Sequence, residues 1–335
     1  MTDLSATALE PEVAPRSTAE ERWRALQTVS RGDAVYRLVL TVFALFLPLL
    51  LLAIAGDLVV GAWPAIAKFG PSFLVRSIWD PVNDQFGALP LIVGTLYSSF
   101  VALLIAVPLS LGTAIFLTEF APRWLRTPVA TMVELLAAVP SVIYGLWGIF
   151  VLIPLLRDHL WPIARPVLGH LPLFSGVFYG PSVLAAGVIL AIMILPYIAA
   201  VSREILLAVP AAQREAGLAL GGTRWETVWR VILPYGRAGI IGAVVLGLGR
   251  ALGETMAVTM VIGNRHEVAL SLLQPGYTIA SAIANEFAEA TSGVHRGTLF
   301  LIGLVLFLIT VLVNALARFL VWRVARGSSV GSTAL

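Results

Sequence analysis

Long runs of uncharged residues recur along this chain, and they restrict it to one environment. Several runs reach about 18 residues or more, enough to cross about 30 Å of hydrocarbon as a helix that rises about 1.5 Å per residue. Of the 335 residues, 59% are hydrophobic and 12% are charged, outside the range of a soluble domain. The short alternating segments of a transmembrane barrel are not seen in the sequence. We therefore expect an all-α polytopic protein in the lipid bilayer, with no nucleic-acid partner.

The uncharged runs predict six transmembrane helices. Their boundaries follow from where charge and turn residues interrupt each run. The expected spans are residues 36–63, 89–118, 129–155, 181–201, 238–263 and 298–323.

The basic residues indicate the orientation, because short loops kept on the cytoplasmic side carry an excess of Lys and Arg. With the N-terminus inside, fifteen of the 22 basic residues fall on the cytoplasmic side and six on the outer side. The remaining one, Arg250, falls within the fifth span. We predict a multi-pass cell-membrane protein with both termini cytoplasmic.

The sequence lacks the residues of several catalytic and metal sites. It has no cysteine, which excludes disulfides and thiolate metal ligands. The single lysine, Lys68, lacks the glycine-rich frame of a phosphate-binding loop, so we expect no nucleotide site, no catalytic residue and no cofactor in this chain. The histidines fall on predicted outer loops at no metal-ligand spacing, and we expect them to be solvated. They are His159, His170, His266 and His295.

A charged insert, residues 203–236, separates the fourth span from the fifth. Pro210 ends the helix that leaves the fourth span, and helix-forming residues then run to Gly221 and Gly222, which stop a helix. The insert therefore begins with a short helix.

A second short helix is predicted directly after the glycines. Thr223 and Glu226 have the spacing of a capping box, and Pro234 is expected to close the helix near residue 232. Its apolar residues recur at helical spacing and form a stripe. They are Trp225, Val228, Trp229 and Ile232.

The first short helix has the composition of a docking element. We expect Arg214 and Glu215 to be exposed beside Ala216 and Gly217, small residues that let another backbone come close. The alternative is a solvated loop whose charges only set the topology.

The fifth span carries a charge near the middle of the bilayer. An arginine there costs on the order of 3 kcal/mol, so Arg250 is expected to face an interior or an aqueous path and to have a partner. Glu254 lies one helical turn away, at the spacing that lets the two side chains meet. Either the pair is structural, or Arg250 binds an anion and Glu254 prevents the anion from being trapped. Three glycines are expected to leave an open path on this side, namely Gly242, Gly249 and Gly253.

The third span contains a helix break. Pro140 removes one amide and loosens the helix near Ser141, whose hydroxyl is expected to bond to the freed backbone rather than to an anion. Glu134 is expected to pair with an arginine such as Arg126, a structural role.

The insert resembles the coupling loop of permeases of ATP-binding-cassette (ABC) importers. The residues that carry the likeness are Glu215-Ala216-Gly217, then Gly221 after three intervening residues, and residues 231–234, "VILP", after nine more. Gly217 stands where that family usually has alanine, and Val231 where it usually has isoleucine; both changes are small or conservative. In that family the short helix inserts into a groove of a separate ATPase subunit.

Two further segments resemble the permeases of the bacterial phosphate-specific transport system. They are "GRALGETMAVTMVIGN", residues 249–264, and "VELLAAVPSVIYGLWG", residues 133–148. Together with the coupling loop they extend the likeness over most of residues 90–323. The resemblance implies a type I ABC importer permease fold and the import of inorganic phosphate.

The resemblance also implies the partners, and the predicted spans divide the chain. We expect a homologous second permease, a cytoplasmic ATPase dimer that binds ATP and magnesium, and an extracytoplasmic phosphate-binding protein. Residues 1–35 would be a cytoplasmic tail, 36–88 the first transmembrane helix and an outer loop, 89–323 the permease core with the coupling insert, and 324–335 a second tail. Arg250 and Glu254 would line the substrate pathway, and the coupling residues would be Arg214, Glu215, Ala216, Gly217 and Gly221.

Other functions remain open at this point. Arginine chemistry alone does not separate phosphate from sulfate or molybdate, so the same architecture would serve another oxyanion. A secondary transporter that works without ATP would show internal duplication, which the sequence does not display. A purely structural scaffold would leave the midplane arginine without purpose.

Overall fold

The computed structural model describes residues 19–326, with side chains described from 32 to 323. The chain divides into two compact units, residues 1–56 and 57–335. In the first unit every described residue belongs to helix α1. The α-helices are α1 Ala19–Phe69, α2 Leu89–Ile115, α3 Arg123–Ala137, α4 Ser141–Trp147, α5 Trp161–Leu168, α6 Val183–Leu207, α7 Ala211–Ala219, α8 Arg224–Thr227, α9 Leu233–Leu252, α10 Met256–Val261, α11 Ile279–Glu286 and α12 Gly293–Arg326.

Shorter helical turns and one hairpin complete the described residues. Strands β1 (Trp79–Asp80) and β2 (Gln85–Phe86) pair antiparallel, with Trp79 opposite Phe86. The 3-10 turns are Gly70–Leu74 and Pro172–Phe174. The wider π-helical turns are Phe116–Phe120, Gly148–Leu152, Leu155–Leu160 and Val228–Ile232.

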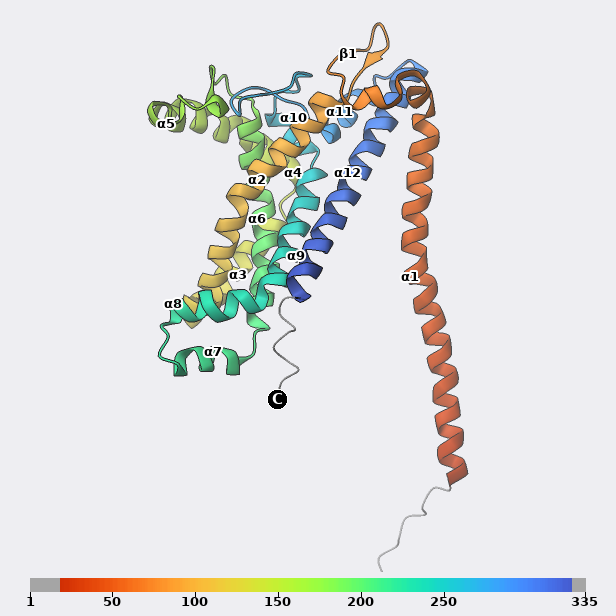
Figure 1. The fold of residues 1–335 in the computed structure, drawn as a ribbon, viewed down its shortest axis with the longest axis vertical. Helices are drawn as coiled ribbons and strands as arrows, with labels where there is room; N and C mark the ends of the chain where they lie inside the picture. The colour runs from red at the N-terminus through yellow and green to blue at the C-terminus, as the bar shows by residue number, and fades with distance from the viewer. Residues whose placement is uncertain (1–18, 327–335) are drawn as a thin grey trace, which may run out of the picture. The chain divides into compact units, whose positions relative to one another are not determined.

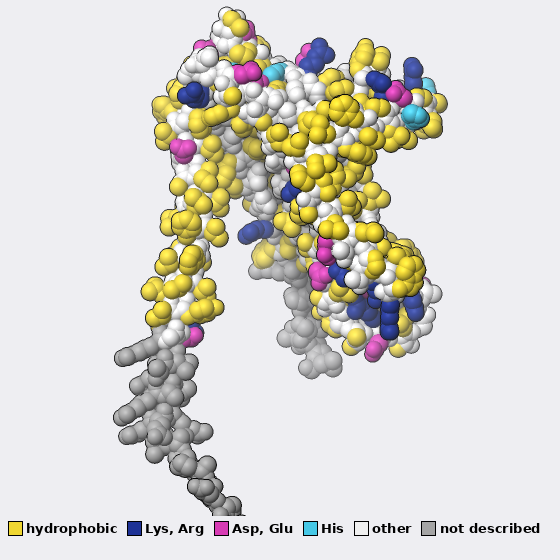
Figure 2. All heavy atoms as spheres, turned by 180° about the vertical axis from the view of Figure 1, so that it is seen from behind, with side chains coloured by type: hydrophobic (Ala, Val, Ile, Leu, Met, Phe, Trp, Pro, Cys, Tyr) yellow, Lys and Arg dark blue, Asp and Glu magenta, His cyan; other side chains and the backbone are white. Residues whose placement is uncertain are grey.

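Six helical segments of the described chain are long and apolar enough to cross a membrane, which confirms the all-α polytopic prediction. In the second unit, α2, α6, α9 and α12 run between an end that carries α7 and α8 and an opposite end that carries α5, α11 and β1 (Figure 1). Hydrophobic side chains dominate the surface between these ends, and charged ones gather at both ends (Figure 2). The six segments are Gly32–Leu74, Leu89–Phe120, Ser141–Leu168, Val183–Leu207, Arg224–Leu252 and Gly293–Arg323.

Helix α6 is the centre of the second unit. Its apolar stretch is 67% buried, a larger share than in any of the other five spans, and it packs against α2, α3, α9 and α10. Small residues on the facing helices allow this close packing, since Ala102 and Ala106 of α2 and Ala243 of α9 are fully buried against it. The main core therefore lies along α6.

The predicted third span is interrupted at Pro140, where the sequence predicted a helix break. Helix α3 ends at Ala137 and α4 starts at Ser141, so the membrane-length segment is 141–168 rather than 129–155. Pro140 cannot donate the amide that would continue α3, and its ring disfavours a helical residue before it. The expected pairing of Glu134 with Arg126 is wrong, because Arg126 Nε donates to the Ala121 carbonyl at 2.9 Å and Glu134 is exposed.

The predicted fifth span is displaced in the opposite direction. Pro234 does not close the second helix of the insert, because a π-helical turn over 228–232 leads without a break into α9. Proline stands where the wider π-helical turn changes to α9, and this change of hydrogen-bond register accommodates its missing amide. The continuous segment runs from 224 to 252, and α9 ends well before the expected boundary at 263.

The backbone of helix α2 lies in direct contact with the backbone of the segment before α11. A Cβ built on Gly94 would lie inside van der Waals contact with the Tyr277 carbonyl oxygen. The next residue, Thr95, accepts a hydrogen bond from the Ile279 amide at 2.9 Å through its hydroxyl. Glycine is therefore required at residue 94 for α2 to reach this segment.

We expect Gly94→Ala to lower the free energy of unfolding by about 1–3 kcal/mol, because the added methyl group has no space and the backbone must move. The measurement is thermal unfolding of the purified protein in lipid nanodiscs. Gly112→Ala on the same helix is the control, since a Cβ there meets nothing within 4 Å. Equal stability of the two variants would contradict the close approach.

Candidate functional site

The insert between α6 and α9 forms two short helices with a glycine turn between them. Gly221 has φ +83°, a left-handed conformation that favours glycine, and this turn ends α7. The predicted capping box is confirmed, since Thr223 Oγ1 accepts from the Glu226 amide at 3.2 Å and Glu226 Oε2 accepts from the Thr223 amide at 2.9 Å. Local sequence alone therefore specifies where α7 ends and α8 begins.

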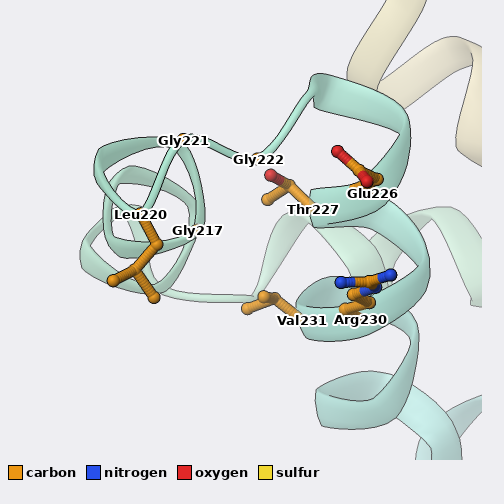
Figure 3. Close-up of a pocket in the computed structure, with 8 residues that line it drawn as sticks. All are labelled: Gly217, Leu220, Gly221, Gly222, Glu226, Thr227, Arg230 and Val231. Atoms are coloured by element: carbon orange, nitrogen blue, oxygen red, sulfur yellow. The ribbon is translucent and has the colours of Figure 1, made fainter.

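A cleft of about 310 Å³ lies between α7 and the helix that follows the turn (Figure 3). Gly217 lines it from α7, and a Cβ there would lie 2.9 Å from the Thr227 side chain, so the two helices touch at this point. Of the expected apolar stripe, Val228 and Ile232 are buried against the ends of α2 and α6, whereas the two tryptophans are exposed. The cleft is lined by Gly217, Leu220, Gly221, Gly222, Glu226, Thr227, Arg230 and Val231.

The outer surface of α7 carries the predicted Glu215 and Ala216, whereas Gly217, expected beside them, packs against Thr227 instead. Glu215 and Ala216 are exposed. The expected exposure of Arg214 is wrong. It forms an ion pair with Glu119 at 3.2 Å, and 25% of its side chain remains accessible.

Arg214 instead fastens α7 to the body of the protein. Its guanidinium donates to the carbonyls of Leu206 and Val209 at 2.6 and 2.8 Å. Leu206 lies in the last turn of α6, where a helix leaves acceptors without intrahelical partners, and Val209 follows the end of that helix. A cation near that end also complements the helix dipole. Arg214 therefore joins α7, α6 and the π-helical turn that holds Glu119.

The membrane arginine lies on the last turn of α9. The guanidinium carbon of Arg250 stands 4.3 Å from the centroid of the Tyr197 ring, a residue of α6. Its Nε is buried, and it has no hydrogen-bond partner among the residues that the structure describes. The charge is thus stabilised by an aromatic face while hydrogen-bond donors remain unused.

The expected contact between Arg250 and Glu254 is wrong. Helix α9 ends at Leu252, so the two residues do not share a continuous helical face, and no ion pair joins them in the described part of the chain. Glu254 lies in the break and its Oε1 accepts from the Ala257 amide at 3.3 Å, near the start of α10. The carboxylate therefore satisfies a free amide where α10 begins.

Open space surrounds two of the three glycines near this arginine. A Cβ on Gly242 or Gly249 would meet nothing within 4 Å, and one on Gly253 would meet only backbone at 3.7 Å. The predicted open side of α9 is therefore present in the isolated chain.

Two tyrosine hydroxyls donate hydrogen bonds to carbonyls at the break before α4. Tyr197 donates to the Ala137 carbonyl at 3.0 Å, and Tyr144 donates to the Leu136 carbonyl at 2.8 Å. Both acceptors belong to the last turn of α3, whose carbonyls have no amide to bond to inside the helix. The repair predicted for Ser141 is thus made by tyrosines.

Comparison with known proteins identifies the family. The family of binding-protein-dependent transport system inner membrane components matches residues 106–326, which include the coupling insert and Arg250. This chain belongs to that family.

Relatives of this permease carry the phosphate name that the sequence resemblance indicated. "Phosphate transport system permease protein PstC" of Pasteurella multocida is 50% identical over 298 residues, covering 88% of this chain and 93% of the relative. The protein of the same name from Xylella fastidiosa is 46% identical over 316 residues, covering 93% of this chain and 97% of the relative. The resemblance to permeases of the phosphate-specific system is confirmed.

Solved structures support the fold of the permease. A chain of the MetNI methionine ABC transporter in an inward-facing conformation matches with a TM-score of 0.51 at 20% identity, covering 74% of this chain and 99% of that one. A chain of a bacterial ABC transporter for the acidic polysaccharide alginate matches with a TM-score of 0.52 at 18% identity, covering 88% and 98%. The predicted type I ABC importer permease fold is confirmed.

The permease also contains a titratable cluster that sequence reasoning missed. Glu286 lies between two imidazoles, with His266 Nε2 at 3.1 Å and His295 Nε2 at 3.2 Å, and Trp79 donates its indole N–H to it at 2.9 Å. The expectation of solvated histidines is wrong for both, since 25% of the His266 side chain and 8% of the His295 side chain are accessible. The described residues contain no group of three suitable side chains for a metal ion.

The cluster fastens together four separate segments at the end opposite α7. It joins the β1–β2 hairpin, the loop after α10, helix α11 and the start of α12. Burial acts to raise the pKa of the Glu286 carboxyl, but its contacts with the imidazoles and the indole outweigh burial and hold the pKa below its ordinary value. Nearby, burial raises the pKa of Tyr277 to about 12. No local sequence pattern predicts this cluster, because its members are far apart in sequence.

We expect Glu286→Gln to lower the Tm at neutral pH, on the order of 2 °C. Since the folded-state pKa of Glu286 is depressed, its carboxylate stabilises the fold above the unfolded pKa of about 4.3, and this stabilisation is lost as pH falls through the folded pKa. The Tm difference from wild type, measured in nanodiscs, should therefore shrink on acidification into that range. Glu289→Gln, an exposed neighbour, is the control. A difference that widened with acid would refute this assignment.

Proposed function

We propose that this permease is the membrane subunit of an ATP-driven importer that moves inorganic phosphate into the cytoplasm. The observation that carries the proposal is the 50% identity, over 88% of the chain, to a relative named as a phosphate transport permease. The positively charged, partly unbonded Arg250 in a membrane helix agrees with an anionic substrate.

The partners follow from the same proposal. A homologous second permease would complete the pore, an extracytoplasmic protein would deliver phosphate, and a separate cytoplasmic ATPase dimer would bind ATP and magnesium. The distribution of basic residues supports a cytoplasmic location for both termini and for α7.

Helix α7 would be the contact with the ATPase. Its outward Glu215 and Ala216 leave a charge beside a surface that another backbone can approach, and Gly217 and Gly221 keep α7 close to α8. Arg214 would serve this contact indirectly, because it holds α7 against α6 and Glu119. Movement of the ATPase would thereby reach the membrane helices.

Arg250 would be the anion contact in the pathway. A guanidinium offers donors in a planar fork that matches two oxygens of a tetrahedral anion. Glu254 would modulate the site from the break that follows α9, where it fixes the start of α10. The open space beside Gly242 and Gly249 would leave room for the passing ion.

We expect Arg250→Ala to lower phosphate uptake by about 10- to 100-fold, because the charge-assisted hydrogen bonds to the ion are lost. The assay is uptake of labelled phosphate by proteoliposomes that contain the whole assembly and ATP. Arg157→Ala is the control, because Arg157 is exposed and pairs only with Asp158 among the described residues. Normal uptake by Arg250→Ala would remove the anion contact from the proposal.

The same assay separates the alternatives. Sulfate and molybdate are added as competitors, and uptake of either in place of phosphate would mean that the permease serves another oxyanion. Vanadate or an inactive ATPase should stop uptake, whereas continued uptake would indicate a secondary transporter.

We expect Glu215→Ala to abolish most phosphate uptake while the permease remains folded, because the exposed carboxylate contributes to the ATPase contact and not to the core. The measurement pairs uptake with the amount of ATPase subunit that copurifies and its ATP turnover. Glu204→Ala is the control, an exposed carboxylate at the end of α6 whose surface ion pair with Arg203 contributes little. Full coupling in Glu215→Ala would place the ATPase contact elsewhere.

A further inference from the structure

The surroundings of Arg250 leave its charge intact. Its contact is the face of the Tyr197 ring at 4.3 Å, and its buried Nε has no hydrogen-bond partner among the described residues. A carboxylate partner would neutralise the arginine and repel an anion, whereas an aromatic face attracts the cation without cancelling its charge. The aromatic face also occupies none of the five guanidinium donors.

The Tyr197 ring is itself held at its far end. Its hydroxyl donates to the Ala137 carbonyl at 3.0 Å, on the last residue of α3. The backbone of Tyr197 belongs to α6, the most buried of the membrane helices. A side chain anchored at both ends presents its ring face in one orientation.

Helix α3 connects this hydroxyl contact to the coupling end of the permease. It starts at Arg123, separated by two residues from the π-helical turn that contains Glu119, and Glu119 forms the ion pair with Arg214 of α7. Arg126 of α3 also donates to the carbonyl of Ala121, the residue that follows this turn. The described contacts thus run without interruption from α7 through α3 to the ring beneath Arg250.

We propose that Tyr197 is the positioning residue for Arg250, whose ring holds the guanidinium ready for the anion and whose hydroxyl ties that position to the end of α3. The inference rests on the proposed function, since it presumes that Arg250 contacts the transported anion. It assigns to Tyr197 no contact with the anion itself.

The test uses the complete assembly in proteoliposomes with saturating, phosphate-loaded binding protein, and it measures phosphate uptake and ATP hydrolysis together. Tyr197→Leu removes the ring, and we expect uptake per ATP hydrolysed to fall about tenfold. Tyr197→Phe keeps the ring and removes only the hydroxyl, and we expect a loss of about threefold. Tyr144→Phe is the matched control, because it removes a hydrogen bond to the same turn of α3 at Leu136 and should leave the ratio within about twofold of wild type.

A double-mutant comparison separates positioning from general stability. If Tyr197 acts through the arginine, the combined variant Tyr197→Leu with Arg250→Lys should be no worse than the more impaired single variant. Effects that multiply would overturn the inference, because they would mean independent roles. If Tyr197→Leu does not assemble, Tyr197→Phe against Tyr144→Phe decides, and equal behaviour of these two would likewise overturn it.

The outcomes distinguish this inference from the function on which it rests. Loss of uptake in Arg250→Ala with wild-type behaviour of Tyr197→Leu would overturn the positioning role and leave the anion contact standing. Wild-type uptake in Arg250→Ala would overturn both.

Discussion

A peptide group that leaves a helix inside hydrocarbon finds no water to bond to, and this constraint decides what surrounds the membrane arginine. Two breaks interrupt the helices near Arg250, one before α4 and one after α9. At the first break, tyrosine hydroxyls donate hydrogen bonds to the last carbonyls of α3. At the second, the Glu254 carboxylate accepts a hydrogen bond from an amide of α10. One of the side chains that bond to the free backbone, Tyr197, is therefore also the one whose ring faces the charge. The helix break and the candidate site share this tyrosine in the described part of the protein.

Features fixed by neighbouring residues could be predicted from the sequence. The six apolar segments follow from hydrocarbon thickness, and the turn between α7 and α8 follows from Gly221 and the capping box of Thr223 with Glu226. The prolines show the limit of such reasoning. Pro140 follows a helix that ends, whereas Pro234 follows a π-helical turn that continues into α9. Residue type alone does not separate these two outcomes, because the preceding turn decides them.

Features made by distant residues could not be predicted in the same way. Arg250 is conspicuous because it is a charge in an apolar run, but Tyr197 is one aromatic residue among many and only the packing of α6 on α9 brings it there. The pairing of Arg250 with Glu254 assumed a helix that continues, and the break at Gly253 removes that assumption. The Glu286 cluster gathers residues from four segments, so no spacing rule could have revealed it.

The continuity between α8 and α9 has a mechanical consequence. A non-helical joint at Pro234 would let the insert swing independently of the fifth span, but the π-helical turn over 228–232 passes directly into α9. The segment changes direction between α8 and α9 without leaving the helix (Figure 1). The cleft beside α7 lies at one end of this bent segment and Arg250 at the other. Movement imposed at the cleft is therefore passed to the arginine along a hydrogen-bonded helix and is not absorbed by a flexible loop.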